Sequence, residues 1–264
     1  MIQRHWEEIC NKNGHNNPVK GSGFMRLAIL GDIHGNLPAL QQVLQDIQKE
    51  QVDAVYCTGD LVGYGPEPNE VLDLLRDVGV QSVMGNHDDA AGYNLPVCGC
   101  AYPDEVMKGI GEKSLAWTKE KVNKVNREFL RGLPEQMEVL LPSSTAMVFH
   151  GSPRAINEYI HRDTDEEILQ ELVEGTEASI FLFGHTHIPF VRTYKDRLFV
   201  NAGSVGQPKD GDNRSCYVLL ECHPGGISIV FKRVPYDFQA VAARVIQAGL
   251  PPELAEILRK GYPL

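Results

Sequence analysis

Two histidines stand two residues apart in the segment IFLFGHTHIP, residues 180–189, directly after an apolar run that ends in glycine. Residues i and i+2 of an extended chain point to the same side, so His185 and His187 could reach one point beyond the strand. Histidine is the commonest side-chain metal ligand, and α/β proteins bind ligands outside the carboxyl ends of parallel strands. Two surface histidines in a loop explain this segment equally well when it is taken alone.

Polar side chains follow four other apolar runs, usually beside a glycine. Each has an ordinary explanation by itself: a carboxylate can cap a helix, an asparagine can occupy a turn and a histidine can be buried. Their occurrence at five strand ends together favours a metal site over these separate explanations. The residues at the four other ends are Asp32 and His34, Asp60, Asn86 and His87, and His150.

The predicted ligand set indicates which chemistry the site could perform. Two carboxylates, one amide and four imidazoles are too many ligands for one tetrahedral zinc. They suit two cations about 3.5–4 Å apart, which can clamp the attacking and leaving oxygens of a displacement at phosphorus. Nitrogen and oxygen ligands without thiolate favour manganese, iron, zinc, nickel or cobalt. Phosphoester hydrolysis is therefore the expected reaction.

Five motifs resemble those of the calcineurin-like metallophosphoesterases: GDIHGN, GDLVGYGPEPNE, GNHDD, FHGSPR and FGHTH, which together span residues 31–187. The resemblance implies an α/β fold, a four-layer αββα sandwich with two facing mixed β-sheets and outer helices. It also implies two divalent metal ions per chain, with manganese as the first choice and iron, zinc, nickel or cobalt as alternatives.

The resemblance assigns a role to each motif residue. His87 would face the substrate as the catalytic residue, stabilise charge on the phosphoryl group and protonate the leaving oxygen, while a metal-bridging hydroxide attacks phosphorus. Asp60 would bridge the two metals. One metal would be held by Asp32, His34 and His187, and the other by Asn86, His150 and His185.

The second motif departs from that of the protein serine/threonine phosphatases, which carry an acidic residue and an arginine where this chain has Gly63 and Tyr64. The chain therefore resembles the small prokaryotic phosphodiesterases of the family more closely. Without that acidic residue, Asp88 is a candidate to orient the catalytic histidine.

Substrate contacts are harder to predict. Arg154 could bind phosphate or be a solvated loop arginine, and Asn36 could bind phosphate or cap the following helix, which is the commoner role. The Gly-rich segment 201–215 could line the site or form an ordinary turn. Its candidates are Asn201, Ser204 and Arg214.

Apolar runs at residues 25–30, 52–58, 80–84, 145–149 and 180–183 predict the strands that must position these residues. Helical spacing between the first three indicates strand–helix–strand units with parallel pairing. Thr164 and Glu167 have capping-box spacing, which predicts a helix that Gly175 ends. Residues 198–200, 215–220 and 227–232 are expected to form an antiparallel meander.

The domain prediction is one metallophosphoesterase domain at residues 25–264. Residues 90–140 are interpreted as a helical insertion beside the mouth of the site, and residues 237–264 as C-terminal helices. Residues 1–24 are expected to be a poorly ordered extension, because they are polar and lack the apolar core of a signal peptide.

Composition excludes some partners. The net charge of −10 argues against general nucleic-acid binding, and no apolar run is long enough to span a membrane. The six scattered cysteines read as reduced thiols, which predicts a cytoplasmic protein. Cys98-Gly-Cys100 resembles half a metal site, but no second such pair exists.

The expected partner is a phosphorylated small-molecule or nucleotide substrate, and a homo-oligomer is left open. Three functions compete: a phosphodiesterase, a nucleotide hydrolase or phosphomonoesterase, and a non-catalytic protein-binding scaffold such as the retromer subunit with this fold.

Overall fold

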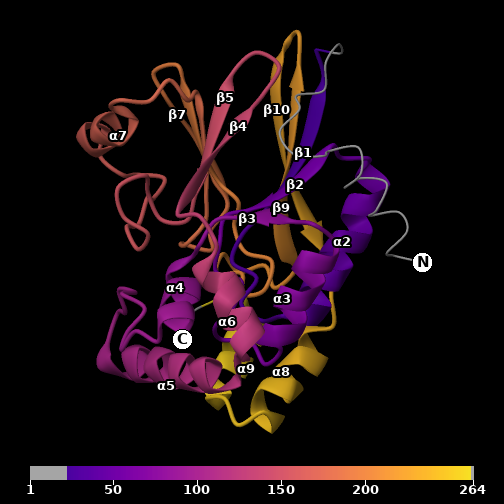
Figure 1. The fold of residues 1–264 in the computed structure, drawn as a ribbon, viewed down its shortest axis with the longest axis vertical. Coiled ribbons are helices and arrows are strands. Elements are labelled where there is room, and N and C mark those ends of the chain that lie inside the picture. The colour runs from indigo at the N-terminus through magenta and orange to yellow at the C-terminus, as the bar shows by residue number, and fades with distance from the viewer. Residues whose placement is uncertain (1–22, 263–264) are drawn as a thin grey trace.

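The structure, a computed structural model, describes residues 23–262, and its strands form two five-stranded sheets (Figure 1). The first sheet has the order β10-β9-β1-β2-β3, with bounds Gly226–Val234, Ser215–His223, Met25–Leu30, Ala54–Cys57 and Gln81–Ser82. The second has the order β4-β5-β6-β8-β7, with bounds Gln136–Leu140, Thr145–Phe149, Ile180–Phe183, Arg197–Asn201 and Phe190–Tyr194.

Both sheets are mixed, as expected. β1, β2 and β3 run parallel, and β9 pairs antiparallel with both β1 and β10. In the second sheet β5, β6 and β8 are parallel, with β4 and β7 antiparallel at the edges. Helices α2 (Leu37–Glu50) and α3 (Pro68–Asp77) link the parallel strands of the first sheet, and α7 (Glu166–Val173) links β5 to β6.

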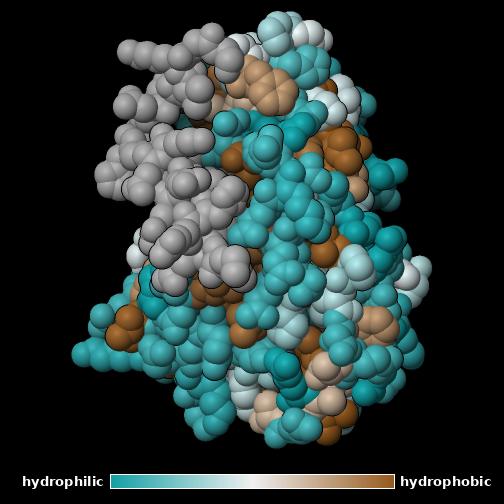
Figure 2. Space-filling view, turned by 90° about the vertical axis from the view of Figure 1, so that its right-hand side faces the viewer, coloured by the Kyte–Doolittle hydropathy of each residue, from teal (hydrophilic) through white to brown (hydrophobic). Residues whose placement is uncertain are grey.

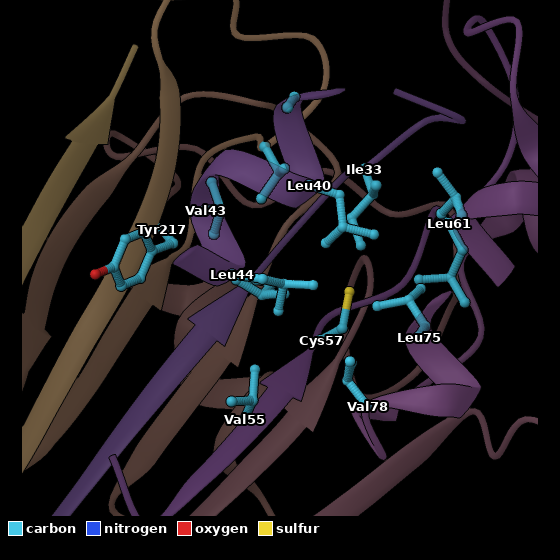
Figure 3. Packing of buried hydrophobic residues seen from close by; sticks show 14 of the residues in the cluster. Ile33, Leu40, Val43, Leu44, Val55, Cys57, Leu61, Leu75, Val78 and Tyr217 are labelled. Atoms are coloured by element: carbon cyan, nitrogen blue, oxygen red, sulfur yellow. The ribbon is translucent and has the colours of Figure 1, made fainter. Parts of the chain in front are cut away.

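Three apolar cores separate four layers. Between α2, α3 and the first sheet, Leu40 and Val43 of α2 face Val55 and Cys57 of β2 (Figure 3). A second core, which includes Ile29 and Leu182, joins the two sheets face to face. A third core joins the outer face of the second sheet to α7. The αββα sandwich is therefore confirmed.

Five further helices gather at one end of the two sheets (Figure 1). They are α4 (Asn86–Tyr93), α5 (Glu105–Lys121), α6 (Lys124–Arg131), α8 (Phe238–Gln247) and α9 (Pro252–Lys260). Ile110 of α5 packs with Val241 of α8 and Leu258 of α9, so these three helices share a small core of their own.

Some local expectations are wrong. The predicted meander does not form, because the segment after β8 carries the chain from the second sheet to β9 in the first. The capping box at Thr164 does not form either: its hydroxyl accepts from the His161 amide, and Asp165 is the N-cap of α7. Strands β4 and β7 were not expected, and the helical part of residues 90–140 breaks at Asn123, whose side chain caps α6.

Most of the expected N-terminal extension, residues 1–22, lies outside the described residues. Within residues 23–262, no helix has the length and apolarity needed to cross a membrane. On the face drawn in Figure 2, hydrophilic residues predominate and hydrophobic ones are scattered among them.

Candidate metal centre and adjoining pocket

The residues predicted to bind metal converge where the strands of both sheets end. Asp32 and Asp60 follow the parallel strands β1 and β2, and His150 and His185 follow the parallel strands β5 and β6. Backbone hydrogen bonds tie these turns together: the amide of Gly206 donates to Asp32 O (3.0 Å) and that of Gly184 to His150 O (3.1 Å). The sheet pairing therefore brings residues from distant parts of the chain to one place.

These residues form two adjacent groups, and each group could hold a cation. Candidate ligand atoms lie within 4.8 Å of one another in each, and all six side chains are buried. The first group is Asp32, His34 and His187, and the second is Asp60, His150 and His185. His185 and His187 are not extended, as the sequence argument assumed; a turn between them sends each into a different group.

The two histidines of the first group face each other through their Nε2 atoms, which suits a cation between them. Nδ1 of His34 donates to Val62 O (3.0 Å) and Nδ1 of His187 donates to Gln207 O (2.6 Å). Both Nε2 atoms therefore carry lone pairs in the neutral rings, yet they lie 3.1 Å apart. Ring orientation by backbone carbonyls is usual for metal-bound histidine. The donor set therefore fits a divalent ion at this point.

The second group has the same construction. Nδ1 of His150 donates to Thr58 O (2.9 Å), and Nε2 of His185 donates to Asn157 O (3.3 Å). Nε2 of His150 lies 3.1 Å from Nδ1 of His185 and 2.9 Å from Oδ1 of Asn86. The Asn86 amide is turned this way because its Nδ2 donates to Cys98 O (2.9 Å). Asn86 thus lies beside the second group.

Asp60 lies between the two groups. Its Oδ2 is 3.6 Å from Nε2 of His34 and 3.4 Å from Nε2 of His150. Its Oδ1 accepts the backbone amide of His87 (2.9 Å). Its carboxylate therefore faces a histidine of each group.

Burial and charge set the protonation of these groups. Burial lowers the pKa of His34 to about 3 and that of His187 well below its usual range, which keeps both rings neutral. Burial alone would raise the pKa of Asp60, but His150 and His87 outweigh it and hold that pKa well below the usual range. Burial raises the pKa of Asp32 to about 7. Burial would lower the pKa of His150, but Asp60 raises it to about 9. Because neutral imidazoles and ionised carboxylates are the forms that ligate metals, His34, His187 and Asp60 already have the ligating form. His150 would instead release a proton when a cation binds.

The backbone at these residues is strained. Asp32, His34, Asp60, His185 and His187 all have φ between +48° and +66°, a region that side chains other than glycine rarely occupy. The neighbouring glycine Gly184 is needed for close approach, because a Cβ there would lie 2.3 Å from Oδ2 of Asp32. Strain of this kind concentrates at functional sites, where the surrounding structure must maintain it.

His87 belongs to neither group and lies beside them, in edge contact with His34 (5.2 Å between ring centroids) and tilted against Tyr64 (4.6 Å). Its Nδ1 is buried without a hydrogen-bond partner in the described chain. The expectation that Asp88 orients it is wrong: that carboxylate accepts the amides of Leu61, Val62 and Gly85 instead.

A pocket of about 240 Å³ opens beside both groups. Asp60, His87, His185 and His187 line its metal side. Tyr64 and Tyr159 pack against this side, with ring centroids 4.6 Å from that of His87 and 3.9 Å from that of His185. The opposite wall is mostly apolar and aromatic: Cys100, Tyr102, Met107, Ile110, Leu254 and Ile257. Tyr64 lies in the GDLVGYGPEPNE motif and Cys100 in the Cys98-Gly-Cys100 segment, but no motif marks the other residues, which come from three separate segments.

Lys209 also lines this pocket and was missed in the sequence, although it lies inside the Gly-rich segment that was expected to contribute. Its half-buried ammonium lies 6.0 Å from the ring centroid of Tyr64 and has no carboxylate partner among residues 23–262. Burial lowers the pKa of Lys209, against the opposing influence of Asp32 and Asp60.

The other candidates of the sequence argument have structural partners. Arg154 is exposed and pairs with Glu158 and Glu171 outside the pocket. Asn36 caps α2 by accepting the Ala39 amide (3.2 Å) and donates to Gly206 O.

Two of the three candidates in the Gly-rich segment form hydrogen bonds to the backbone of the candidate metal centre. Asn201 donates to Gly184 O (2.6 Å), and Ser204 donates to Asp32 O (2.7 Å). Arg214 instead pairs with Asp212 on the surface.

A four-layer sandwich with two histidine and carboxylate groups at its strand ends is the arrangement of a metallophosphoesterase. Residues 25–225 match the calcineurin-like phosphoesterase superfamily domain. An uncharacterized protein of Methanocaldococcus jannaschii is 33% identical over 252 residues, 89% of this chain and 98% of that protein. The chain therefore belongs to the calcineurin-like phosphoesterase superfamily.

Two further similarities extend this comparison. A metallophosphoesterase from Sphaerobacter thermophilus has a crystal structure that matches with a TM-score of 0.73 and 31% identity, covering 90% of this chain and 99% of that one. A symmetrical bis(5'-nucleosyl)-tetraphosphatase of Erwinia tasmaniensis is 43% identical over 67 residues, which is 24% of each protein.

Proposed function

We propose that the chain is a dinuclear, metal-dependent phosphoester hydrolase that prefers phosphodiesters. The observation that carries the proposal is the pair of Nε2 atoms of His34 and His187, opposed at 3.1 Å with both Nδ1 atoms already donating to carbonyls. Asp32 completes that group. Asn86, His150 and His185 would hold a second divalent ion, and Asp60 would contact both.

Two divalent cations, once bound, supply Lewis acidity toward phosphoryl oxygens and an activated water. We propose manganese, with iron, zinc, nickel and cobalt as alternatives that the same nitrogen and oxygen donors accept. The free thiols of the described cysteines suit the reducing conditions of the cytoplasm, where we place the activity.

His87 is the proposed general acid. It lines the pocket without belonging to either metal group, and its backbone amide is fixed by the Asp60 carboxylate (2.9 Å). An imidazole so placed can donate a proton to the leaving oxygen of an ester held against the two groups. Gly63 leaves room for the ring, because a Cβ there would lie 2.5 Å from Nδ1 of His87.

Lys209 replaces Arg154 as the proposed phosphate contact. An ammonium without a carboxylate partner among residues 23–262, facing a pocket next to two cation sites, is favourable only when an anion lies between them. A phosphoryl group would be that anion. Arg154 is already paired with two glutamates outside the pocket and is not proposed again.

The pocket wall favours a second candidate, a nucleotide hydrolase. Tyr102 offers an aromatic surface against which a nucleobase could pack, and Ile110 and Leu254 add apolar surface. The local similarity to a bis(5'-nucleosyl)-tetraphosphatase supports this substrate class, although the match spans about a quarter of that enzyme.

The test uses full-length protein stripped by a chelator and reloaded with Mn²⁺. Bis(p-nitrophenyl) phosphate, p-nitrophenyl phosphate and a dinucleoside tetraphosphate are assayed side by side. Hydrolysis that vanishes with the metal and returns with Mn²⁺ is expected, and the fastest substrate decides between the diesterase and nucleotide proposals. Protein that binds two metals per chain and cleaves none of the three would contradict the enzyme proposal and favour a protein-binding scaffold.

A further inference from the structure

A third group of candidate metal ligands lies on the other side of His87. It consists of His87, Cys98 and Cys100, whose ligand atoms lie within 4.8 Å of one another. Sγ of Cys100 is 3.5 Å from Nε2 of His87, and Sγ of Cys98 is 2.8 Å from Sγ of Cys100. The sequence showed only half a metal site at Cys98-Gly-Cys100, and the fold supplies a third ligand, His87, from the first turn of α4.

Two asparagine side chains hold the backbone of the loop that carries the two thiols. Nδ2 of Asn86 donates to Cys98 O (2.9 Å), and Nδ2 of Asn157 donates to Gly99 O (3.0 Å). Gly99 has φ +75°, and a Cβ there would lie 2.5 Å from Nδ2 of Asn157. These contacts require glycine between the cysteines and hold both sulfurs on the side that faces His87.

We propose that His87, Cys98 and Cys100 form a third, separate site for a thiophilic divalent cation of the zinc and cadmium class. In a tetrahedral zinc site the sulfur and nitrogen ligands lie roughly 3.5 Å apart, which matches the Cys100–His87 distance. Two sulfur ligands lie about 3.8 Å apart, so Cys98 must move away from Cys100 by about 1 Å.

Charge and access also suit such an ion. Both thiols lose their protons to the buffer on binding, and two thiolates cancel the charge of a divalent ion. A third ion here therefore adds no net charge beside the proposed dinuclear centre. The Tyr102 hydroxyl, 3.4 Å from Sγ of Cys98, or a water from outside can take the fourth position. A second cavity, of about 420 Å³, is lined by Cys98, Cys100 and Tyr102 and gives the ion an entrance.

The site has a consequence for catalysis. Nε2 of His87 cannot ligate this ion and also face a substrate, so thiophilic cations become inhibitors. This consequence rests on the proposed function, whereas the binding of the ion does not.

The binding test titrates Cd²⁺ into reduced, Mn²⁺-loaded protein and follows the ultraviolet charge-transfer absorption of thiolate–cadmium bonds. We expect the band to saturate at one Cd²⁺ per chain and to vanish in the double variant Cys98→Ser/Cys100→Ser. Cys222→Ala, which removes a buried thiol of β9, serves as the matched control and keeps the band. A wild-type protein without the band, or a double variant that retains it, overturns the proposal.

The inhibition test compares each protein with its own metal-supported activity. Zn²⁺ is expected to inhibit the double variant at concentrations at least tenfold higher than the wild type. Equal sensitivity of both proteins overturns the inhibitory role. If the protein hydrolyses nothing, the proposed function fails while the cadmium titration still decides whether the site exists.

Discussion

The two sides of the pocket are built in different ways. On the metal side, His34, His150 and His187 are buried, and each is fixed by a backbone carbonyl at the end of a sheet. On the opposite wall, Tyr102, Ile110 and Leu254 come from a loop or a helix that packs outside the two sheets. The first side fixes the chemistry with backbone geometry, and the second is free to vary in shape without disturbing it.

The two sides also differ in backbone strain. Five residues of the metal side occupy the left-handed backbone region, which costs of the order of 1–3 kcal/mol for each residue. The cores on both faces of the sheets must offset that cost. The wall helices α5 and α9, which share a separate core with α8, show no comparable strain, so changes in these two helices should affect substrate choice more than metal binding.

The largest effect is expected from Asp60→Asn on the metal side. Asp60 lies within 3.6 Å of a histidine in each group, and an amide cannot replace its charge between two cations. Changes to outer-shell groups alone cost about 10–100-fold, so activity should fall by more than about 100-fold. Metal content after dialysis should fall with it. A variant that keeps two metals and full activity would contradict the bridging position.

The second-largest effect is expected at His87, which lies in the pocket beside the two metal groups. His87→Ala should lower turnover by about 10²–10⁴-fold, the usual contribution of a general acid, and leave metal content unchanged. His223→Ala, in the β9–β10 hairpin, is the control and should match the wild type in both measurements. Loss of metal in His87→Ala would place this residue among the ligands, and full turnover at neutral pH would remove it from the reaction.

The metal side was predictable because each candidate ligand follows an apolar strand. Parallel pairing of β1 with β2 and of β5 with β6 requires such residues to meet, whatever the sequence between them. Even here the local geometry was wrong: His185 and His187 are separated by a turn rather than extended. The strand predictions depended on the same kind of signal. Strands β6 and β9 were predicted because they are continuous apolar runs, and β4 was missed because its apolar residues alternate only weakly at a sheet edge.

The opposite wall was not predictable. Tyr102, Ile110 and Leu254 meet only because α5 and α9 pack together across the end of the sandwich, and no spacing in the sequence records this contact. Lys209 was missed for another reason. Among the polar residues of its segment, nothing local distinguishes it from Arg214, which pairs with Asp212 on the surface.

Lys209→Met should have a smaller effect, confined to substrate affinity. A hydrogen bond to a charged group contributes about 1.5–3 kcal/mol, so kcat/KM should fall by roughly 10–100-fold with the metals retained. Lys209→Arg should recover part of the loss. The matched change Arg154→Met should leave kcat/KM unaltered, because that side chain is exposed and pairs with glutamates. Equal effects of Lys209→Met and Arg154→Met would contradict the assignment of the phosphate contact.

The smallest effects are expected when two glycines of α5, Gly109 and Gly111, are replaced by alanine. A Cβ at Gly109 of α5 would meet nothing within 4 Å, whereas one at Gly111 would lie close to the Tyr102 hydroxyl. Because alanine favours a helix over glycine by about 0.5–1 kcal/mol, Gly109→Ala should raise the melting temperature by about 2 °C. Gly111→Ala must displace Tyr102 and should lose that gain while changing the substrate preference. Equal melting temperatures and substrate preferences for the two variants would mean that Tyr102 does not shape the pocket.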